Sequence, residues 1–339
     1  MSRARESVKE TSLQRRHTVL GLGAALGAGL LGWPARAPAQ AEIPAPGSTL
    51  KYVVPFVAGG LTDVMARIVA QRLAENWKLN VVVENRAGAN AQTGADHVAK
   101  TVSDGSQILA ITQSHAVNVS LFPNAPFSLT KDLRPLAMLA ESPMLIVVPA
   151  ASPIRDFRQL MAVSKSKDLS ASSAGSGSGP HLTLELFNDL NGSKILHVPY
   201  KGGAPSITDL VAGHVDLSFS NFPNSLPFVK AGSLRALAIC SLSRHPDLPD
   251  VPTAREAGMP DLVVENWTAV MAHARTPDAV VERYSRELVR IMTSPDIADK
   301  VTQRGYRVNA MGSEEFGRYL KAEIERWGRV VKTARITAN

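Results

Sequence analysis

Two glycine-rich segments of this chain combine residue types that bind anions. The first holds the pair Gly59 and Gly60, followed by Thr62 and Asp63; the second, residues 172–181, holds four serines, three glycines and a histidine. Each lies after a strand-like run and before a helix-like run. Glycine lets the backbone approach a ligand closely, and the start of a helix leaves N–H groups free for an anion. The two segments therefore predict two lobes that hold one small anionic ligand.

Each segment also has an ordinary structural interpretation. Thr62 and Asp63 are residue types that cap helices. A carboxylate facing an anion is unfavourable, so Asp63 either orients the loop or accepts a hydrogen bond from the ligand. A segment rich in serine and glycine is also typical of a flexible linker. The place of residues 172–181 between a strand and a helix favours a nest of hydroxyl and N–H donors, with His181 lining the cleft.

Other polar residues follow predicted strands and are weaker candidates. Tyr200, before Lys201 and Gly202, would add a phenol donor, although a simple turn before a helix explains it equally well. Ser114, within the run Gln113-Ser114-His115, and Asn221 also lie just beyond strands. Ligands of open α/β sheets bind at the carboxyl ends of the strands, so these residues are placed to reach the same cleft.

Motifs for catalysis, nucleotides and metals are missing from the sequence. Residues 175–179 do not match GxGxxG, the Walker spacing is absent, and glycine occupies the position where a nucleophile elbow requires serine. HExxH, CxxC and calcium-loop patterns are also missing, and the eight histidines are scattered. We therefore expect no enzyme activity, no catalytic residue, no cofactor and no metal.

Strand-like and helix-like runs alternate along most of the chain. This alternation is typical of βαβ units, so we expect an α/β fold with largely parallel sheets flanked by helices. From residue 278 onward we expect helices at 278–292, 295–304 and 313–333. The extended segments near residues 149 and 265 would connect two compact lobes.

The N-terminal segment has the parts of a secretory signal peptide. Arg15 and Arg16 precede a short apolar stretch over residues 19–33, and Ala39-Gln40-Ala41 forms a cleavage signal. The alternative, an uncleaved membrane anchor, requires a longer apolar stretch. We expect cleavage after Ala41 and location in the periplasm. The arginine pair also suggests twin-arginine export, although Thr18 stands where a bulky apolar residue is usual.

The charge and the cysteine content exclude a nucleic-acid partner and an intramolecular disulfide. Residues 1–41 hold six basic and two acidic residues, so without them the formal net charge falls from +7 to +3. The rest of the chain has no basic cluster with interleaved aromatics, so we expect no nucleic-acid partner. Cys240 is the single cysteine, which excludes an intramolecular disulfide, and its apolar surroundings predict a buried strand position rather than a catalytic one.

Ordered landmarks along residues 51–331 together resemble a known family. They are Val54-Pro55-Phe56 with Gly59-Gly60 and Asp63, residues 82–89 (VVENRAGA), residues 173–178 (SAGSGS) with His181, residues 197–202 (HVPYKG), residues 248–253 (LPDVPT) with Glu256-Ala257-Gly258, and Trp267. With these landmarks the chain resembles the Bug-type periplasmic solute receptors, the substrate-binding proteins of tripartite tricarboxylate transporters. Each landmark is weak by itself, whereas their shared order is specific.

The resemblance implies a two-lobed, hinged α/β receptor of the flytrap type. It implies a first lobe of residues 42–148 plus 266–339, to which the C-terminal helices return, and a second lobe of residues 149–265. In such receptors two βα turns hold a carboxylate through N–H groups, hydroxyls and bridging waters. The implied ligand-binding residues are Phe56, Gly59, Gly60, Thr62 and Asp63 of the first turn, Ser173, Gly175, Ser176 and His181 of the second, and the variable positions Asn90, Ser114, Tyr200 and Asn221.

The chain also departs from the family pattern. Val57 and Ala58 replace a proline-containing form before the paired glycines. Residues 89–91 (ANA) interrupt a turn that is usually glycine-rich, and residues 218–221 (SFSN) lack an acidic residue that often recognises an amino group. These departures bear on which ligand the chain selects.

The sequence thus predicts a periplasmic receptor that captures a small organic anion, a carboxylate, without catalysis. We expect a monomer that delivers its ligand through transient contact with the integral-membrane subunits of a transporter. One alternative is a receptor that reports ligand occupancy to a membrane kinase. Another is an exported hydrolase that uses a serine of the second turn with His181, although no base held by a third group is evident.

Overall fold

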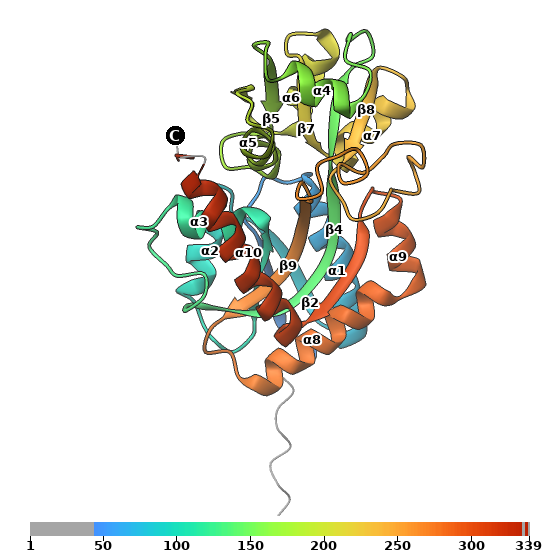
Figure 1. Ribbon diagram of the computed structural model, residues 1–339. Coiled ribbons are helices and arrows are strands. Elements are labelled where there is room, and N and C mark those ends of the chain that lie inside the picture. Colours follow the sequence, from blue (N-terminus) through green and yellow to red (C-terminus); the bar gives the residue numbers. More distant parts are fainter. Residues whose placement is uncertain (1–43, 334–335, 338–339) are drawn as a thin grey trace, which may run out of the picture. The chain divides into compact units, whose positions relative to one another are not determined.

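A computed structural model describes residues 44–333 and 336–337 (Figure 1). The predicted export segment, residues 1–41, lies outside the described residues. Within the described residues ten strands form one sheet, in which eight strands follow the order β2-β1-β3-β9-β4-β7-β5-β6 while β8 and β10 each pair with β4. The long central strand β4 therefore belongs to both halves of the sheet.

The first half of the sheet combines parallel and antiparallel pairs. Its strands are β1 (Thr49–Val54), β2 (Asn80–Asn85), β3 (Gln107–Thr112), β4 (Leu133–Pro149), β9 (Glu265–His273) and β10 (Arg307–Gly312). Strand β1 pairs in parallel with β2 and β3, whereas β9 runs antiparallel to β3 and β4, and β10 antiparallel to β4. The predicted parallel arrangement thus holds for β1, β2 and β3, whereas β9, β4 and β10 pair antiparallel.

The second half repeats this arrangement with shorter strands. They are β5 (Ser170–Ser173), β6 (Leu196–Pro199), β7 (Leu217–Asn221) and β8 (Leu234–Ile239). Strand β5 pairs in parallel with β6 and β7, and β4 runs antiparallel to β7 and β8. Strand β4 pairs with β9 as far as Pro143 and with β7 from Met144 onward, so its partners change between two consecutive residues.

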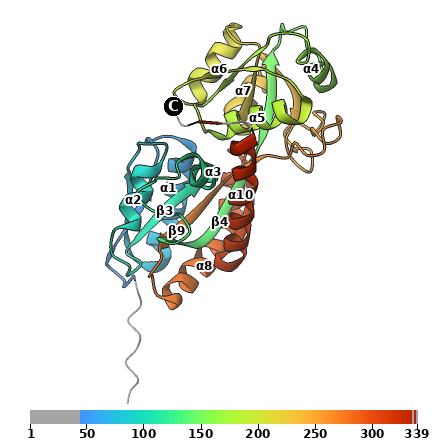
Figure 2. The same cartoon turned by 60° about the vertical axis from the view of Figure 1, so that its left-hand side comes forward.

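Helices cover both faces of each half. They are α1 (Leu61–Trp77), α2 (Gln92–Ala99), α3 (Gln113–Leu121), α4 (Phe157–Val163), α5 (Gly179–Asn191), α6 (Gly203–Ala212), α7 (Phe222–Lys230), α8 (Asp278–Thr293), α9 (Pro295–Thr302) and α10 (Ser313–Thr333). Against the first half, α1 and α8 pack on one face and α2, α3 and α10 on the other. Against the second half, α4 and α5 pack on one face and α6 and α7 on the other (Figures 1 and 2).

The alternation of side chains along β1 builds two of these cores. Tyr52 and Val54 point into the core beneath α1 and α8, while Val53 points into the core beneath α2 and α10. Successive residues of a strand face opposite sides of the sheet, so a strand covered on both sides is apolar at every position. The apolar run of β1 therefore marks it as an inner strand, with partners on both edges.

Helix α10 joins the two halves. Its carboxyl-terminal residues Trp327 and Val331 are buried in the same core as Phe187 of α5, and Figure 2 shows this end of α10 beside α5. The buried Glu323 carboxylate accepts hydrogen bonds from the indole N–H groups of Trp267 in β9 and Trp327, at 3.0 and 2.9 Å. A buried carboxylate needs such donors, so Glu323 fixes α10 against the central strands.

Candidate functional site

The first glycine-rich turn, between β1 and α1, is held by the Asp63 carboxylate. Asp63 is 2% exposed and accepts hydrogen bonds from the Gly59 N–H (2.9 Å), the Arg67 guanidinium (2.9 and 3.1 Å) and the Asn85 amide (2.9 Å). Burial alone would raise the pKa of Asp63, but these donors outweigh it and hold the pKa below its usual range. Of the two roles expected for Asp63, the hydrogen bonds show that it orients the loop.

The second turn, between β5 and α5, is held by histidine and serine side chains rather than by a buried carboxylate, and the Glu185 carboxylate lies 3.5 Å from His181 Nε2. The Gly177 N–H donates to His181 Nδ1 at 3.0 Å, and the Ser178 hydroxyl donates to the Gly175 carbonyl at 2.6 Å. Gly177 has a φ of +73°, a conformation that glycine adopts without strain. His181 is 7% exposed, so its ring supports the turn from beneath.

A second histidine lies behind this turn. The rings of His181 and His197, from β6, stack with centroids 3.7 Å apart. The Ser173 hydroxyl lies 2.6 Å from His197 Nε2 and also accepts a hydrogen bond from the Gly175 N–H. Burial and the neighbouring His181 lower the pKa of His197 to about 4, so His197 is neutral at pH 7.

The start of helix α3 contacts both turns. The Phe56 ring of the first turn meets the His115 ring edge-on, with centroids 6.2 Å apart. A β-carbon added to Gly179, at the start of α5, would lie 2.9 Å from the side-chain oxygen of Gln113. The end of β3 therefore lies between the two turns that the sequence singled out.

The turn before α2 also reaches the second turn. A β-carbon on Gly177 would lie 3.1 Å from Asn90 Nδ2, which shows how closely the two segments approach. Asn90 itself exchanges hydrogen bonds with Asn118 of α3, at 2.9 and 2.7 Å. Residues 89–91, which depart from the family pattern, all have positive φ angles (46°, 51° and 70°). Three consecutive non-glycine residues in this conformation are strained, and the Asn90–Asn118 contacts help to hold them.

Three predicted hydroxyl groups remain available to a ligand. Thr62, Ser114 and Ser176 are partly exposed, and within the described residues their hydroxyls have no hydrogen-bond partner. Helices α1 and α5 both begin without a hydrogen bond from a capping side chain. Their first N–H groups and these hydroxyls are donors without protein acceptors, as an anion-binding site requires.

Gln113 belongs to the run Gln113-Ser114-His115 noted in the sequence, from which only Ser114 was predicted as a ligand contact. Gln113 is 1% exposed, and neither polar atom of its side-chain amide has a partner among the described residues. Leaving a buried amide unpaired costs about 1–3 kcal/mol per group, so the amide is placed to bind something else. Its position directly after β3, one residue before Ser114, was the available signal.

Two other predicted residues are already engaged by the protein. The Tyr200 hydroxyl donates to Asp209 at 2.7 Å, and the Asn221 side-chain oxygen accepts from Asn266 at 3.2 Å. The Tyr200 carbonyl would lie 3.2 Å from a β-carbon on Gly175, so the β6–α6 turn does adjoin the second turn. For Tyr200 the backbone, rather than the phenol, lies nearest the site.

The Ser173–His197 contact does not have the geometry of a hydrolase site. The Ser173 hydroxyl is buried, with 1% of the residue exposed, and no carboxylate among the described residues hydrogen-bonds to the His197 ring. Ser176, which is partly exposed, has no histidine partner within that same part of the chain. A serine nucleophile needs both access and a base held by a third group. The Ser173–His197 pair therefore supports the turn.

The described residues contain no group of three or more histidine, cysteine, aspartate or glutamate side chains that could hold a metal ion. No helix in residues 44–333 is both long and apolar enough to span a bilayer.

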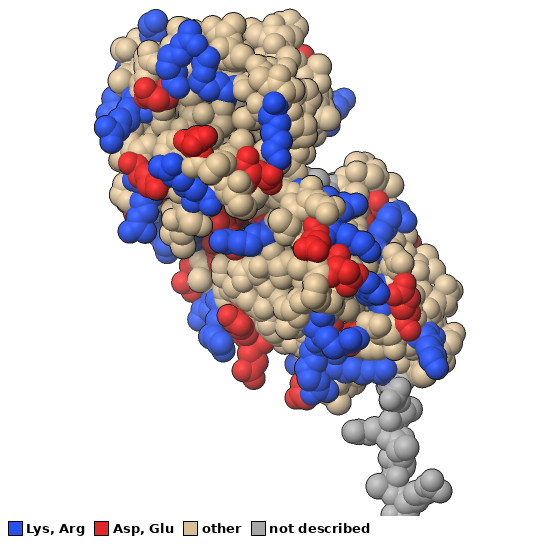
Figure 3. Space-filling view, turned by 90° about the vertical axis from the view of Figure 1, so that its right-hand side faces the viewer, with Lys and Arg blue, Asp and Glu red and all other residues tan. Residues whose placement is uncertain are grey.

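Cys240 is fully buried, as expected, and burial raises the pKa of its thiol. On the face shown in Figure 3, basic and acidic side chains are interspersed.

Known proteins share this fold and sequence. A family model described as the tripartite tricarboxylate transporter family receptor matches residues 65–336. The protein BugT of Bordetella pertussis is 34% identical over 291 residues, covering 85% of this chain and 89% of BugT. The solved structure of Rpa4515 from R. palustris with adipate is 33% identical with a TM-score of 0.79, covering 86% of this chain and 99% of that chain.

A further solved structure agrees with these matches. MatC from Rhodopseudomonas palustris, solved with bound malate, is 31% identical with a TM-score of 0.75, covering 84% of this chain and 99% of that chain. These likenesses confirm the expected two-lobed α/β fold and the resemblance to Bug-type receptors. The chain therefore belongs to the family of tripartite tricarboxylate transporter receptors.

Proposed function

We propose that this protein captures a small organic anion, a carboxylate, at the start of α3 between the two glycine-rich turns. The observation that carries the proposal is the set of donors without protein acceptors: the Thr62, Ser114 and Ser176 hydroxyls and the uncapped starts of α1 and α5. The relatives solved with adipate and malate hold carboxylates, which supports the same ligand class here. The remaining predicted contacts, Phe56, Gly60 and Asn90, would shape the site around the ligand.

The site favours an acceptor ligand over one that carries an amino group. The Asp63 carboxylate already has hydrogen bonds from Gly59, Arg67 and Asn85, and the Asn221 oxygen has one from Asn266. A ligand amine would therefore find few free acceptors beyond the Gln113 oxygen. Hydrogen bonds to a charged group contribute about 1.5–3 kcal/mol each, so a few suffice for micromolar affinity after ordering costs.

Closure of two lobes would complete the site. The family resemblance implied one lobe of residues 42–148 plus 266–339 and another of residues 149–265; we keep these two lobes but move their boundary on β4 to residues 143–144, because residues 144–148 pair with β7 and β8. The change of partners along β4 supports a hinge at residues 143–144. There the backbones of Met144, Cys240 and Val264 are linked in a ring by three hydrogen bonds of 2.8–3.1 Å. A ligand that contacts both lobes shifts the population toward the closed state by its differential affinity.

We further propose that the receptor acts outside the cytoplasm, after export with residues 1–41 removed. There it would deliver its ligand, as a monomer, to the membrane subunits of a tripartite tricarboxylate transporter. The family description supports this role. A sensor for a membrane kinase is the alternative, and crosslinking of the liganded receptor in native membranes separates the two by the partner recovered. A kinase in place of transporter subunits would refute the delivery role and leave ligand capture intact.

Thermal unfolding with a panel of ligands tests the capture proposal. Adipate, malate and citrate are compared with the matching amides, which are uncharged. At about a hundredfold excess over Kd, binding adds about 2.7 kcal/mol to the stability of the folded state. We expect stabilisation by some carboxylates and by none of the amides. Absence of any shift, with protein shown by mass spectrometry to be free of ligand, would refute a carboxylate ligand.

Variants then locate the site. Thr62→Val and Ser176→Ala each remove one hydroxyl donor, so we expect about a tenfold weaker carboxylate affinity for each. Ser166→Ala, at an exposed serine outside the turns, is the matched control and should keep the affinity. Isothermal titration calorimetry measures all three. Unchanged affinity in both turn variants would place the ligand elsewhere.

A further inference from the structure

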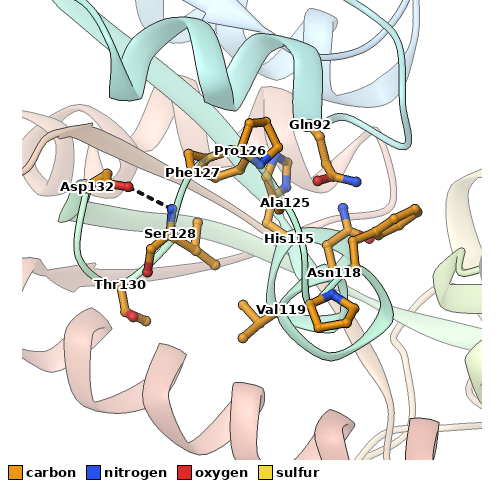
Figure 4. A pocket seen from close by; sticks show the side chains of 13 residues that line it. Gln92, His115, Asn118, Val119, Ala125, Pro126, Phe127, Ser128, Thr130 and Asp132 are labelled. Atoms are coloured by element: carbon orange, nitrogen blue, oxygen red, sulfur yellow. Dashed lines mark hydrogen bonds between the residues drawn. The ribbon is translucent and has the colours of Figure 1, made fainter.

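A pocket separate from the two turns lies beside helix α3. Its volume is about 390 Å³, and it is bounded by the start of α2, one side of α3 and the segment 122–132 that leads into β4 (Figure 4). None of the residues proposed above for the carboxylate lines it. Figure 4 shows Ser128, Thr130 and Asp132 at one side of the pocket and Gln92 and Asn118 at the other. Pockets of this size hold small organic ligands.

The wall of the pocket contains a buried hydrogen-bond donor without a partner among the described residues. His115 lines the pocket and is 2% exposed. Its Nδ1 accepts a hydrogen bond from the Thr112 N–H at 3.1 Å, and burial lowers the pKa of His115 to about 4. The neutral ring therefore carries its proton on Nε2, and Nε2 has no hydrogen-bond partner among the described residues. A ligand oxygen that accepted this hydrogen bond would offset the desolvation penalty of the buried, unpaired N–H group.

The other walls are mostly apolar and almost without charge. The apolar lining residues are Val119, Phe122, Pro123, Ala125, Pro126, Phe127 and Leu129. Among the described lining residues Asp132 alone carries a charge, and its carboxylate accepts the Ser128 N–H at 2.7 Å. An anion entering this pocket would lose water without gaining a cation, and it would meet the Asp132 charge. The pocket is therefore unsuited to the carboxylates expected at the turns.

We propose that this pocket is a second binding site, for a small uncharged molecule with an apolar ring and one hydrogen-bond acceptor such as an amide or ketone oxygen. The ring packs against Phe122, Phe127 and the prolines, and the acceptor pairs with His115 Nε2. Gln92 and Asn118, which are 8% and 7% exposed, lie on the same side of the pocket as His115 and add polar groups there (Figure 4). The site does not depend on the proposed carboxylate function.

Helix α3 connects this pocket to the turns. Asn118 lines the pocket and also holds Asn90, which lies against Gly177 of the second turn. His115 likewise contacts Phe56 of the first turn. An occupant of the pocket thus touches residues that support the carboxylate site, while making no contact with the turns themselves.

Benzamide is a suitable probe because it joins a flat ring to one carbonyl acceptor. Its binding is followed in the full protein through the proton–nitrogen signal of His115 Nε2–H, and Val119→Trp, described below, separates binding in this pocket from binding beside Phe56. We expect a saturable shift with a Kd of about 1 mM or below, as for a fragment-sized ligand. Toluene lacks the acceptor and should bind about tenfold more weakly. Equal affinity for toluene, or no shift with benzamide at about 20 mM, would overturn the proposal.

A filled pocket provides the matched test. Val119 is 39% exposed on the wall of the pocket, so Val119→Trp can fill the space without disturbing a core. We expect this variant to weaken benzamide binding more than tenfold while keeping the unfolding transition. Val211→Trp, at a 38% exposed valine of α6, should bind benzamide as the parent protein does. Benzamide binding that Val119→Trp leaves unchanged would place the probe elsewhere and contradict the assignment.

Discussion

The two glycine-rich turns have equivalent positions in their halves of the sheet, yet they are held by different chemistry. The first is fixed by one buried carboxylate, Asp63, which draws three donors to itself. The second is fixed by histidine and serine side chains, chiefly through His181 Nδ1 and the Ser173–His197 contact. Both leave the first N–H groups of a helix uncapped. The difference shows that a turn with free N–H and hydroxyl donors must be held rigidly, but that either a buried carboxylate or histidine and serine side chains can hold it.

Replacement of Asp63 should have the largest effect, because one charge organises the whole first turn. Asp63→Asn removes the charge and places an amide N–H₂ group among the Gly59, Arg67 and Asn85 donors. Hydrogen bonds to charged groups contribute about 1.5–3 kcal/mol each, so we expect a loss of about 2–3 kcal/mol in unfolding free energy. Denaturant unfolding measures it. Asp250→Asn, at an exposed aspartate, is the control and should be near neutral.

Loss of Asp63 should also weaken carboxylate binding, because the Gly59 N–H would no longer hold the loop. If Asp63→Asn kept both stability and affinity, the charged anchor would be unnecessary and the contrast between the turns would fail.

Acid should weaken the second turn before the first. The pKa of His197 is lowered to about 4 in the folded protein, against about 6.5 when unfolded, so its contribution to stability is present above pH 6.5 and is lost as the pH falls toward 4. The pKa of Asp63 is lowered as well, so its contribution is lost only below the usual aspartate range, near pH 4. The pKa of His115 is also lowered to about 4, so His115 adds to the stability that is lost as the pH falls from 6.5 to 4.

His197→Asn therefore should reduce the slope of stability against pH between 6.5 and 4 by at most about 1.4 kcal/mol per pH unit. Urea unfolding at several pH values gives this slope. His214→Asn, at a largely exposed histidine, is the control. An unchanged slope in His197→Asn would show that His197 is not buried neutral.

His181 should contribute less than Asp63, because its hydrogen bond is between neutral groups. His181→Phe keeps a ring to stack on His197 but removes the acceptor for the Gly177 N–H. We expect a loss of about 1 kcal/mol in unfolding free energy and a several-fold weaker carboxylate affinity. His181→Asn retains an acceptor near the same position, so it should restore part of both. Equal behaviour of the two variants would show that packing, rather than the hydrogen bond, holds this turn.

The sequence predicted the turns well because their signals are local. Glycines, hydroxyl residues and a strand-to-helix boundary occur together within about ten residues, and backbone chemistry decides the rest. The helix expected over 313–333 has these bounds in the structure, since its apolar face repeats regularly. Short elements were missed: α3, α7 and β10 lack a clear period, and their conformation depends on tertiary packing.

The contacts that join the turns could not be predicted from the sequence. The approach of Gln113 to Gly179 links residues 66 positions apart, and nothing near either residue in the chain indicates it. The length of β4 was also missed, because its two apolar runs, residues 136–140 and 144–148, are separated by Glu141, Ser142 and Pro143 and only the second was assigned to a strand. Its first part contains Pro135, Glu141 and Pro143 and becomes a strand by pairing with β9.

The smallest effect should come from the α2 turn, in which Gly88 is followed by three non-glycine residues, 89–91, that all have positive φ angles. Ala89 is exposed and has a φ of 46°, so Ala89→Gly relieves backbone strain without losing buried surface. We expect a gain of about 0.5–1 kcal/mol in unfolding free energy, reduced by the greater freedom of glycine in the unfolded chain. Ala87→Gly, two residues earlier and also exposed but without a positive φ, should instead destabilise slightly. Opposite signs, measured by denaturant unfolding, would show that residue 89 is strained in the folded protein. Two losses of equal size would mean that it is not.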